Sequence, residues 1–206
     1  MRIGIFGGSF DPVHLGHLLL AEAAREQAQL DEVWFVPVSQ QPLKRDRTLS
    51  DATHRVQMLE LAIGGNEAFR VSHVELDRGG ISYTVDTLEA LHNQSPSAEF
   101  CFLLGADSVR DLPRWREPRR ICELATLLIA CRPQSPTPDL NALGQQLGFE
   151  AGHVVRAQRI DMPQVDLSSS ELRERIRSGR SIRYRVTRAV EKYIQSNDLY
   201  RGTATV

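Results

Sequence analysis

Two histidines near the N-terminus have the spacing of a phosphate-binding site. His14 and His17 are three residues apart at the start of an expected helix, so they share one face and their imidazoles can reach one phosphate. An imidazole donates a hydrogen bond when neutral and is cationic when a polyphosphate raises its pKa, which suits charge building up on a transferring phosphoryl group. Zinc binding by the pair lacks a third ligand other than Asp11, so no metal held by the protein is predicted.

The segment in front of these histidines is a glycine turn. Residues 2–6 form an expected strand that leads through Gly7 and Gly8 into the helix. Glycines let a phosphate approach the backbone closely, and a helix start supplies unpaired N–H groups and the positive end of a dipole. A βα turn also carries glycines for purely structural reasons, but with the histidine pair beside it this turn predicts a nucleotide-phosphate site. The predicted site residues are Gly7, Gly8, Ser9, Phe10, His14 and His17.

A second anion site is predicted near the C-terminus, where an expected helix begins at Ser169. Ser168 and Glu171 fit a capping box, which by itself indicates only a helix start. Hydroxyl groups on the first turn and Arg173 one turn further along are also suited to binding a phosphate. From the residues alone both interpretations stay open. The predicted phosphate ligands are Ser168, Ser169, Ser170 and Arg173.

The elements that position these residues alternate along the chain. Apolar segments of strand length alternate with amphipathic segments of helix length, which is typical of parallel βαβ units. Strands are expected at residues 2–6, 32–38, 69–75, 100–104, 126–131 and 154–160, and helices at 15–29, 51–63, 85–93, 139–146, 169–178 and 186–196. Loops are expected at 38–49 and 132–138. The predicted class is α/β, and ligands of such sheets bind outside the carboxyl ends of the strands.

Length and composition fit one globular domain of 206 residues, with the helical part at about 166–201 belonging to it. A net charge of −1 gives no basic field, so nucleic acid is not expected as a partner, and the arginine-rich stretch 173–188 is more simply a solvated helix face. No apolar run reaches membrane-spanning length, and three cysteines without metal-ligand spacing indicate reduced thiols. A cytoplasmic protein that does not bind membranes is expected.

The segment GGSFDPVHLGH at residues 7–17 resembles the signature of the HxGH nucleotidyltransferases, whose fold is a Rossmann-like parallel sheet with helices on both faces. The segment DLSSSELR at 166–173 resembles the ISSTxxR segment, which in those enzymes holds the ATP phosphates opposite the HxGH turn. The resemblance implies that the two motifs bracket the triphosphate of ATP. It implies catalytic roles for His14, His17, Ser169 and Arg173.

Four further segments narrow the resemblance, over nearly the whole chain, to the bacterial nicotinate-mononucleotide adenylyltransferase family. They are SYT with DTL at 82–88, GADS at 105–108, the surroundings of Trp115 and the closing DLYR at 198–201. In that family the SYT turn and the tryptophan receive the nicotinate ring and its carboxylate, and the GxD aspartate contacts sugar hydroxyls. The implied ligands are Tyr83, Thr84, Trp115 and Arg116 for the mononucleotide, and Gly105 and Asp107 for ATP. From the residues alone, Trp115 could equally belong to the core and Asp107 could cap a helix.

One loop departs from the family. Where the family commonly has a PPHK-like sequence, this chain has QPLK at 41–44, which lacks the histidine and keeps Lys44 as an expected phosphate ligand of the mononucleotide site. A surface lysine in a basic loop is the alternative. The other histidines match no motif and are given no role: His54, His73, His92 and His153.

The resemblance implies in-line attack of the mononucleotide phosphate on the α-phosphorus of ATP, with release of pyrophosphate. The attacking phosphate is a dianion near neutral pH, so positioning and charge stabilisation replace a general base. Mg²⁺ is expected to be held mainly by the ATP phosphates and water. The alternatives are a pantetheine-phosphate adenylyltransferase, which is shorter and lacks the SYT and tryptophan segments, and a non-catalytic nucleotide sensor on the same fold. A homo-oligomer is left open.

Overall fold

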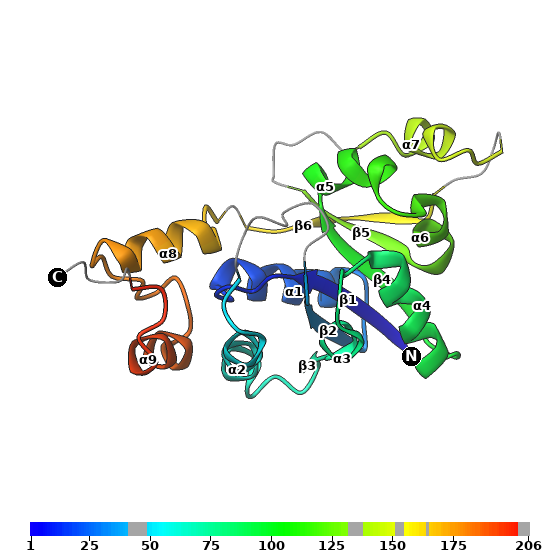
Figure 1. Ribbon diagram of the computed structural model, residues 1–206. Helices are drawn as coiled ribbons and strands as arrows, with labels where there is room; N and C mark the ends of the chain where they lie inside the picture. Colours follow the sequence, from blue (N-terminus) through cyan, green and yellow to red (C-terminus); the bar gives the residue numbers. More distant parts are fainter. Residues whose placement is uncertain (41–48, 132–137, 151–154, 164, 202–206) are drawn as a thin grey trace.

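In the described residues, six parallel strands form a sheet in the order β3-β2-β1-β4-β5-β6 (Figure 1). The computed structural model describes residues 1–40, 49–131, 138–150, 155–163 and 165–201. The strands are β1 (Arg2–Gly8), β2 (Glu32–Pro37), β3 (Phe69–Val71), β4 (Glu99–Gly105), β5 (Thr126–Cys131) and β6 (Ala157–Asp161). The strand order reverses between β1 and β4, which is where open parallel sheets bind ligands. The predicted Rossmann-like α/β class is confirmed.

Helices cover both faces of the sheet, and each face has its own apolar core. One core contains apolar residues of α1 (Leu15–Gln27), α2 (Ala52–Ile63), α8 (Ser169–Arg177) and α9 (Arg188–Ser196). The other contains those of α3 (Val74–Arg78), α4 (Thr84–Gln94), α5 (Ala106–Asp111), the 3₁₀ turn η1 (Leu112–Arg114), α6 (Pro118–Leu124) and α7 (Leu140–Gln146). Figure 1 shows α8 and α9 together at one side of the molecule, beyond α1 and α2.

The central strand β1 illustrates why these segments pair. Residues Ile3 and Ile5 are buried in one core and Phe6 in the other, as expected for a strand covered on both faces. Ile5 lies opposite Trp34 of β2 and Phe102 of β4. The carboxyl end of β1 is therefore flanked by apolar neighbours on both sides, which fixes the position of the glycine turn that follows it.

Each predicted strand and helix is found within the described residues, most of them with shifted ends. The expected strand at 69–75 ends at Val71, because its pairing with β2 ends there and the chain enters α3 at Val74. The expected strand at 154–160 begins at Ala157, and residue 154 lies outside the described residues. The expected helix at 186–196 begins at Arg188. The short segments α3, α5, η1 and α6 were not predicted.

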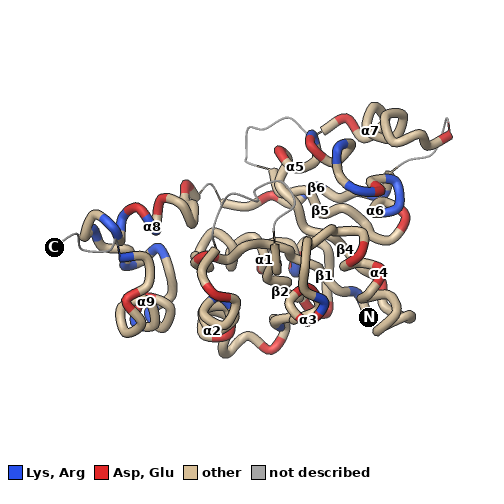
Figure 2. Tube along the Cα trace, in the orientation of Figure 1, with Lys and Arg blue, Asp and Glu red and all other residues tan. Residues whose placement is uncertain are grey.

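Charged residues of both signs alternate along α8 (Figure 2). Arg177 pairs with Glu174 at 2.6 Å, and Arg175 lies 3.9 Å from Glu171. These pairs support a solvated helix face for Arg175 and Arg177, whereas Arg173 is turned toward Asp11 and the stretch after Arg177 is not helical until α9. No helix among the described residues is long and apolar enough to span a membrane. The division into one domain stays a prediction.

Candidate active site

The glycine turn after β1 is held by an aromatic cluster beneath it. Phe10 is fully buried and has a φ of 47°, a backbone conformation that bulky residues rarely adopt. Its ring lies against Phe6 and Phe35, with centroids 5.4 and 5.6 Å away. A Cβ added to Gly8 would come within 2.9 Å of that ring, whereas one added to Gly7 would meet no atom within 4 Å. Gly8 is thus required for packing, Gly7 borders open space, and both glycines line the adjacent cavity.

The two histidines meet at the start of α1, as their spacing predicts. His14 is the N-cap residue, and its ring stacks on that of His17 at a centroid distance of 3.7 Å. The backbone N–H of His14 donates to Nδ1 of His17 at 3.2 Å, so His17 also caps the helix. Gly16 makes room for this arrangement, because a Cβ there would lie 3.1 Å from His14 Nδ1. The structural and the functional interpretation of the pair are therefore compatible.

Both imidazoles are neutral near neutral pH in the nucleotide-free protein. Burial lowers the pKa of His14 to about 4. Burial, and then the neighbouring His14, hold the pKa of His17 well below its usual value. Since Nδ1 of His17 accepts a hydrogen bond, the neutral ring carries its proton on Nε2 and can donate it to a phosphate oxygen.

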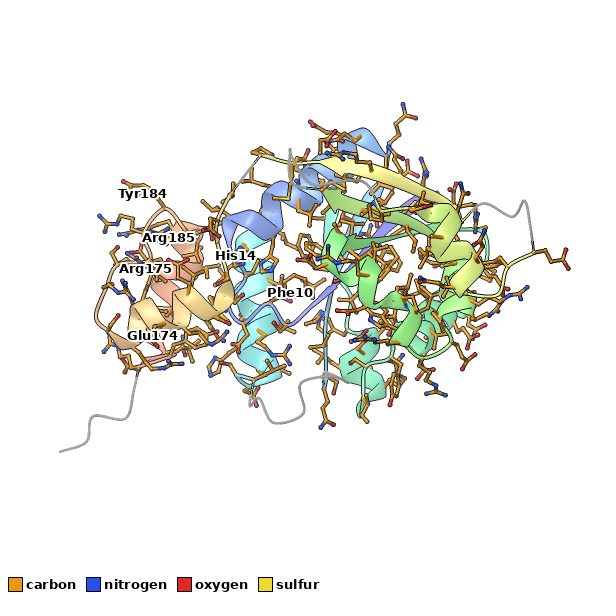
Figure 3. All side chains as sticks on the ribbon, turned by 90° about the horizontal axis from the view of Figure 1, so that it is seen from above. Phe10, His14, Glu174, Arg175, Tyr184 and Arg185 are labelled. Atoms are coloured by element: carbon orange, nitrogen blue, oxygen red, sulfur yellow. The ribbon has the colours of Figure 1, made fainter. Side chains whose placement is uncertain are left out.

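The first N–H of α1 is already bonded. Leu15 N–H donates to the carbonyl of Arg185 at 2.9 Å. The helix start was expected to offer unpaired N–H groups to a phosphate, and this one already has a partner. Figure 3 shows His14 near the segment that carries Arg185. The loop between α8 and α9 therefore closes over the start of α1.

The C-terminal motif lies directly against the glycine turn. Ser168 caps α8 by accepting a hydrogen bond from the Glu171 N–H at 3.1 Å, which confirms that half of the predicted capping box. Ser169 Oγ donates to the carbonyl of Pro12 at 2.9 Å. Arg173 donates to the carbonyl of Asp11 at 2.5 Å and to Ser170 Oγ at 3.1 Å. The two phosphate motifs, more than 150 residues apart in sequence, are thus joined through one stretch of backbone.

A buried polar group supports this backbone from below. The Asp11 carboxylate is only 1% exposed, accepts a hydrogen bond from Tyr200 Oη at 2.7 Å and lies 4.0 Å from Arg173. Arg55, which is 2% exposed, donates to the carbonyls of Ser9 and Ser50 at 3.2 and 3.0 Å. Burial lowers the pKa of Arg55, and the charge of Asp11 opposes that shift. A buried carboxylate requires such compensation.

A cavity of about 420 Å³ opens at the carboxyl ends of the central strands, on the other side of the glycine turn. Its volume is in the range of small-molecule sites. Aromatic side chains form part of its wall, and Gly7 and Gly8 belong to its lining. The implied mononucleotide residues among the described part of the chain all lie on this wall: Tyr83, Thr84, Trp115 and Arg116.

The aromatic side chains of the cavity are held in place by neighbours. Trp115 is half-buried and packs edge-on against Phe102 of β4, with centroids 6.2 Å apart, so it is neither a core residue nor a free loop residue. The Arg116 guanidinium lies 4.9 Å from the centre of the Tyr83 ring and 3.2 Å from Asp86. Tyr83 is the N-cap residue of α4. The first N–H groups of a helix have no partner within it, so those of Thr84 and its successor are oriented to receive an anion.

A second buried carboxyl group lies behind the start of α4. Glu75 is 5% exposed, and its Oε1 accepts a hydrogen bond from Thr87 at 2.7 Å. Ser82 Oγ accepts from the Ser39 N–H at 2.9 Å and so ties the SYT segment to the end of β2. Burial raises the pKa of Glu75, while the hydroxyl groups of Ser82 and Thr87 oppose that shift. The hydrogen bonds of Glu75 and Ser82 hold the turn that carries Tyr83 and Thr84.

The remaining predicted ligands are less closely connected to the site. Gly105 and Asp107 lie at the end of β4 and the start of α5, exposed and outside the cavity lining. Asp107 pairs with Arg110, and the N-cap residue of α5 is Gly105, so Asp107 is not a helix cap. Lys44 lies outside the described residues.

Several buried polar residues that support the candidate site were missed by sequence reasoning. Asp11 was considered only as a zinc ligand, and the DLYR segment that contains Tyr200 only as part of a resemblance. Arg55 and Glu75 received no role. A charged residue inside an otherwise apolar helix face, as Arg55 is among Val56, Met58 and Leu59, is the signal that could have identified one of them.

The fold and the paired phosphate motifs define a nucleotidyltransferase: the family model described as cytidylyltransferase-like matches residues 5–175. The chain is 43% identical over 200 residues to a protein of Thermomicrobium roseum named "Probable nicotinate-nucleotide adenylyltransferase", covering 97% of this chain and 92% of that one. A relative of the same name from Roseiflexus castenholzii is 45% identical, covering 97% and 98%. The chain therefore belongs to the nicotinate-nucleotide adenylyltransferase family.

Solved structures agree with the fold. The nicotinic acid mononucleotide adenylyltransferase of Plasmodium falciparum, complexed with NaAD, superposes with a TM-score of 0.76 over 97% of both chains. Its sequence identity to this chain is 22%, so the likeness concerns the fold. The predicted fold family and the predicted enzyme class are both confirmed.

Proposed function

We propose that the protein transfers the AMP part of ATP to the phosphate of nicotinate mononucleotide, forming nicotinate adenine dinucleotide and pyrophosphate in NAD biosynthesis. The observation that carries the proposal is the position of the Gly7–Gly8 pair. It begins the turn that leads to His14 and His17, and it also lines the aromatic cavity. A phosphate bound at this turn would lie between the two halves of the site.

The reaction needs positioning more than acid–base chemistry. A phosphate oxygen of the mononucleotide attacks the α-phosphorus of ATP, a new P–O bond forms, and the bond to the bridging oxygen of the leaving pyrophosphate breaks. Neutral His17 donates from Nε2 to the phosphate oxygens on which charge develops, and His14 lies stacked beside it. Ser169 and Arg173 reach the same phosphates from α8.

The cavity receives the mononucleotide. The nicotinate ring packs against Tyr83 and Trp115, and its carboxylate accepts hydrogen bonds from the backbone N–H groups at Thr84. Arg116 adds positive charge at the rim, where solvent screens it. Lys44 contacts the mononucleotide phosphate, and Gly105 with Asp107 contacts the ribose of ATP.

Magnesium enters with ATP as part of the substrate. Among the described residues there is no group of three or more His, Cys, Asp or Glu side chains that could hold a metal ion. The Asp11 carboxylate beside the phosphate motifs is engaged by Tyr200 and by the Ser50 N–H. The donors at the turn suit phosphate oxygens, so Mg²⁺ is coordinated by those oxygens and water.

We also place the protein in the cytoplasm. Its cysteines, Cys101, Cys122 and Cys131, are buried free thiols. Burial raises the pKa of Cys122 to about 11, so this thiol is unreactive. Such cysteines suit a reducing compartment.

The test is incubation of the purified protein with MgATP and nicotinate mononucleotide, with pyrophosphate release and dinucleotide formation measured together. Matched reactions contain nicotinamide mononucleotide, pantetheine phosphate or no acceptor. We expect product with the pyridine mononucleotides only. Product with pantetheine phosphate alone would reassign the acceptor, and ATP binding without any product would show a nucleotide sensor.

A further inference from the structure

The chain end after α9 returns to the turn that follows β1. Tyr200 lies in this segment, and its hydroxyl donates to Asp11 Oδ1 at 2.7 Å. The φ angles of Asp198 and Tyr200 are 49° and 63°, in the left-handed region that a tyrosine rarely adopts. Such backbone persists only where surrounding contacts hold it, and these angles direct the tyrosine side chain toward Asp11.

The carboxylate that Tyr200 contacts is the centre of the buried polar group. Its Oδ1 accepts from Tyr200, and its Oδ2 accepts from the Ser50 N–H at 3.3 Å and lies 4.0 Å from Arg173 Nη1. Burial raises the pKa of Tyr200, so its hydroxyl remains a protonated donor at physiological pH. Without that donor, one oxygen of a buried carboxylate would lose its hydrogen bond.

The backbone of the same residue determines where the phosphate ligands lie. Arg173 donates to the Asp11 carbonyl, and Ser169 donates to the carbonyl of Pro12, the next residue. A change in the Asp11 side chain can therefore pass to both ligands through two consecutive peptide units. The mononucleotide residues are held separately, by α4 and by the segment around Trp115, which belong to the core on the other face of the sheet.

We propose that Tyr200 is a positioning residue for the ATP-phosphate half of the site, acting through Asp11 on Arg173 and Ser169. The inference rests on the proposed function in that ATP is the nucleotide bound there. It gives a role to the closing DLYR segment, which the reaction itself leaves unexplained.

The test is Tyr200→Phe, which keeps the ring and removes only the hydroxyl. Binding of α,β-methylene-ATP, which does not transfer AMP, and of nicotinate mononucleotide is measured separately by calorimetry. We expect the Kd for the ATP analogue to rise about tenfold, which is about 1.4 kcal/mol, because the buried carboxylate loses a hydrogen-bond donor. The Kd for the mononucleotide should change less than twofold.

Tyr193→Phe is the matched control. Tyr193 lies on α9, and its hydroxyl is bonded to His54 Nδ1 of α2 at 2.9 Å rather than to Asp11. The Tyr193→Phe variant also loses one tyrosine hydroxyl and should keep wild-type affinity for the ATP analogue, even if its thermal stability falls. Equal losses in the two variants, an unchanged Kd in Tyr200→Phe, or equal weakening of both ligands would each refute the role of Tyr200.

Asp11→Asn provides a second variant if Tyr200→Phe does not fold. It keeps the side-chain shape and must show the same selective loss of ATP-analogue affinity. In the double variant Tyr200→Phe with Asp11→Asn, the losses of ATP-analogue affinity must not add, because each change disrupts the same hydrogen bond between Tyr200 and Asp11. Wild-type protein that binds neither ligand would refute the proposed function and this inference with it, whereas wild-type turnover with unselective variants refutes the inference alone.

Discussion

The adjacent glycines of the phosphate turn are expected to respond oppositely to the same substitution. In Gly8→Ala the new methyl group meets Phe10 Cζ at 2.9 Å. That ring cannot move aside, because it is fully buried against Phe6, Phe35 and His17. Overpacking of this kind costs about 1 to 3 kcal/mol. For a chain of this length, that corresponds to a fall in Tm of about 2 to 12 °C.

In Gly7→Ala the methyl group meets no protein atom within 4 Å and projects beside the cavity that Gly7 lines. The folded protein loses nothing, and the restricted unfolded chain favours folding by about 0.4 to 1 kcal/mol. A misplaced methyl group in a binding site is worth about 1 to 3 kcal/mol, so kcat/KM should fall by roughly tenfold or more.

Thermal unfolding followed by circular dichroism measures the Tm of the two variants, and steady-state pyrophosphate release measures their kcat/KM. Each variant serves as the control for the other. We expect a low Tm in Gly8→Ala and a normal Tm with impaired kinetics in Gly7→Ala. Normal kinetics in Gly7→Ala would show that substrates do not approach the backbone there. An unchanged Tm in Gly8→Ala would contradict the packing of Phe10.

Four further outcomes are expected. His17→Ala and His14→Ala should each lower kcat by on the order of a hundredfold or more while circular dichroism shows a retained fold; near-normal turnover would remove that histidine from the chemistry. Arg173→Ala should raise the KM for ATP far more than that for nicotinate mononucleotide in steady-state kinetics, and equal changes would take it out of the ATP site. The ratio of kcat/KM for nicotinate over nicotinamide mononucleotide should be about a hundred or more, because the amide turns its own donors toward the N–H groups at Thr84; a ratio near one would contradict this pocket. Because the folded-state pKa of His14 is lowered from 6.5 to about 4, the unfolded chain binds more protons between these values, and stability falls as pH drops through that window. The full shift is worth about 3 kcal/mol, so the Tm of His14→Gln should depend less on pH over this range than that of the wild type.

The parts of the site that lie within one βα unit could be predicted from the sequence. A strand, two glycines and two histidines one turn apart are close along the chain, so helix and strand periodicity alone bring His14 and His17 together. The same holds for the start of α8, where Ser168 caps the helix it precedes. These features depend on local geometry, which sequence patterns report directly.

The buried support of the site could not be predicted in this way. The hydrogen bond between Tyr200 and Asp11 joins residues 189 positions apart, and no local pattern reports such a contact. The helix α3 has only five residues, too few to show helical periodicity, so Glu75 was assigned to a strand. The packing constraint on Gly8 could not be predicted either, because it depends on the tertiary position of the Phe10 ring.

The two halves of the site depend on different cores. The phosphate turn and α8 are anchored by Phe10, Val13 and Leu172, which belong to the core on one face of the sheet. The cavity wall is anchored by Phe102 and, behind Trp115, by the core on the other face. Strands β1, β2, β4 and β5 each contribute side chains to both cores, and the glycines at the end of β1 lie where the two halves of the site adjoin. In the proposed reaction the two substrates therefore rest on different cores and meet at the end of β1, so the geometry of the transfer step depends on how rigidly the sheet joins the two cores.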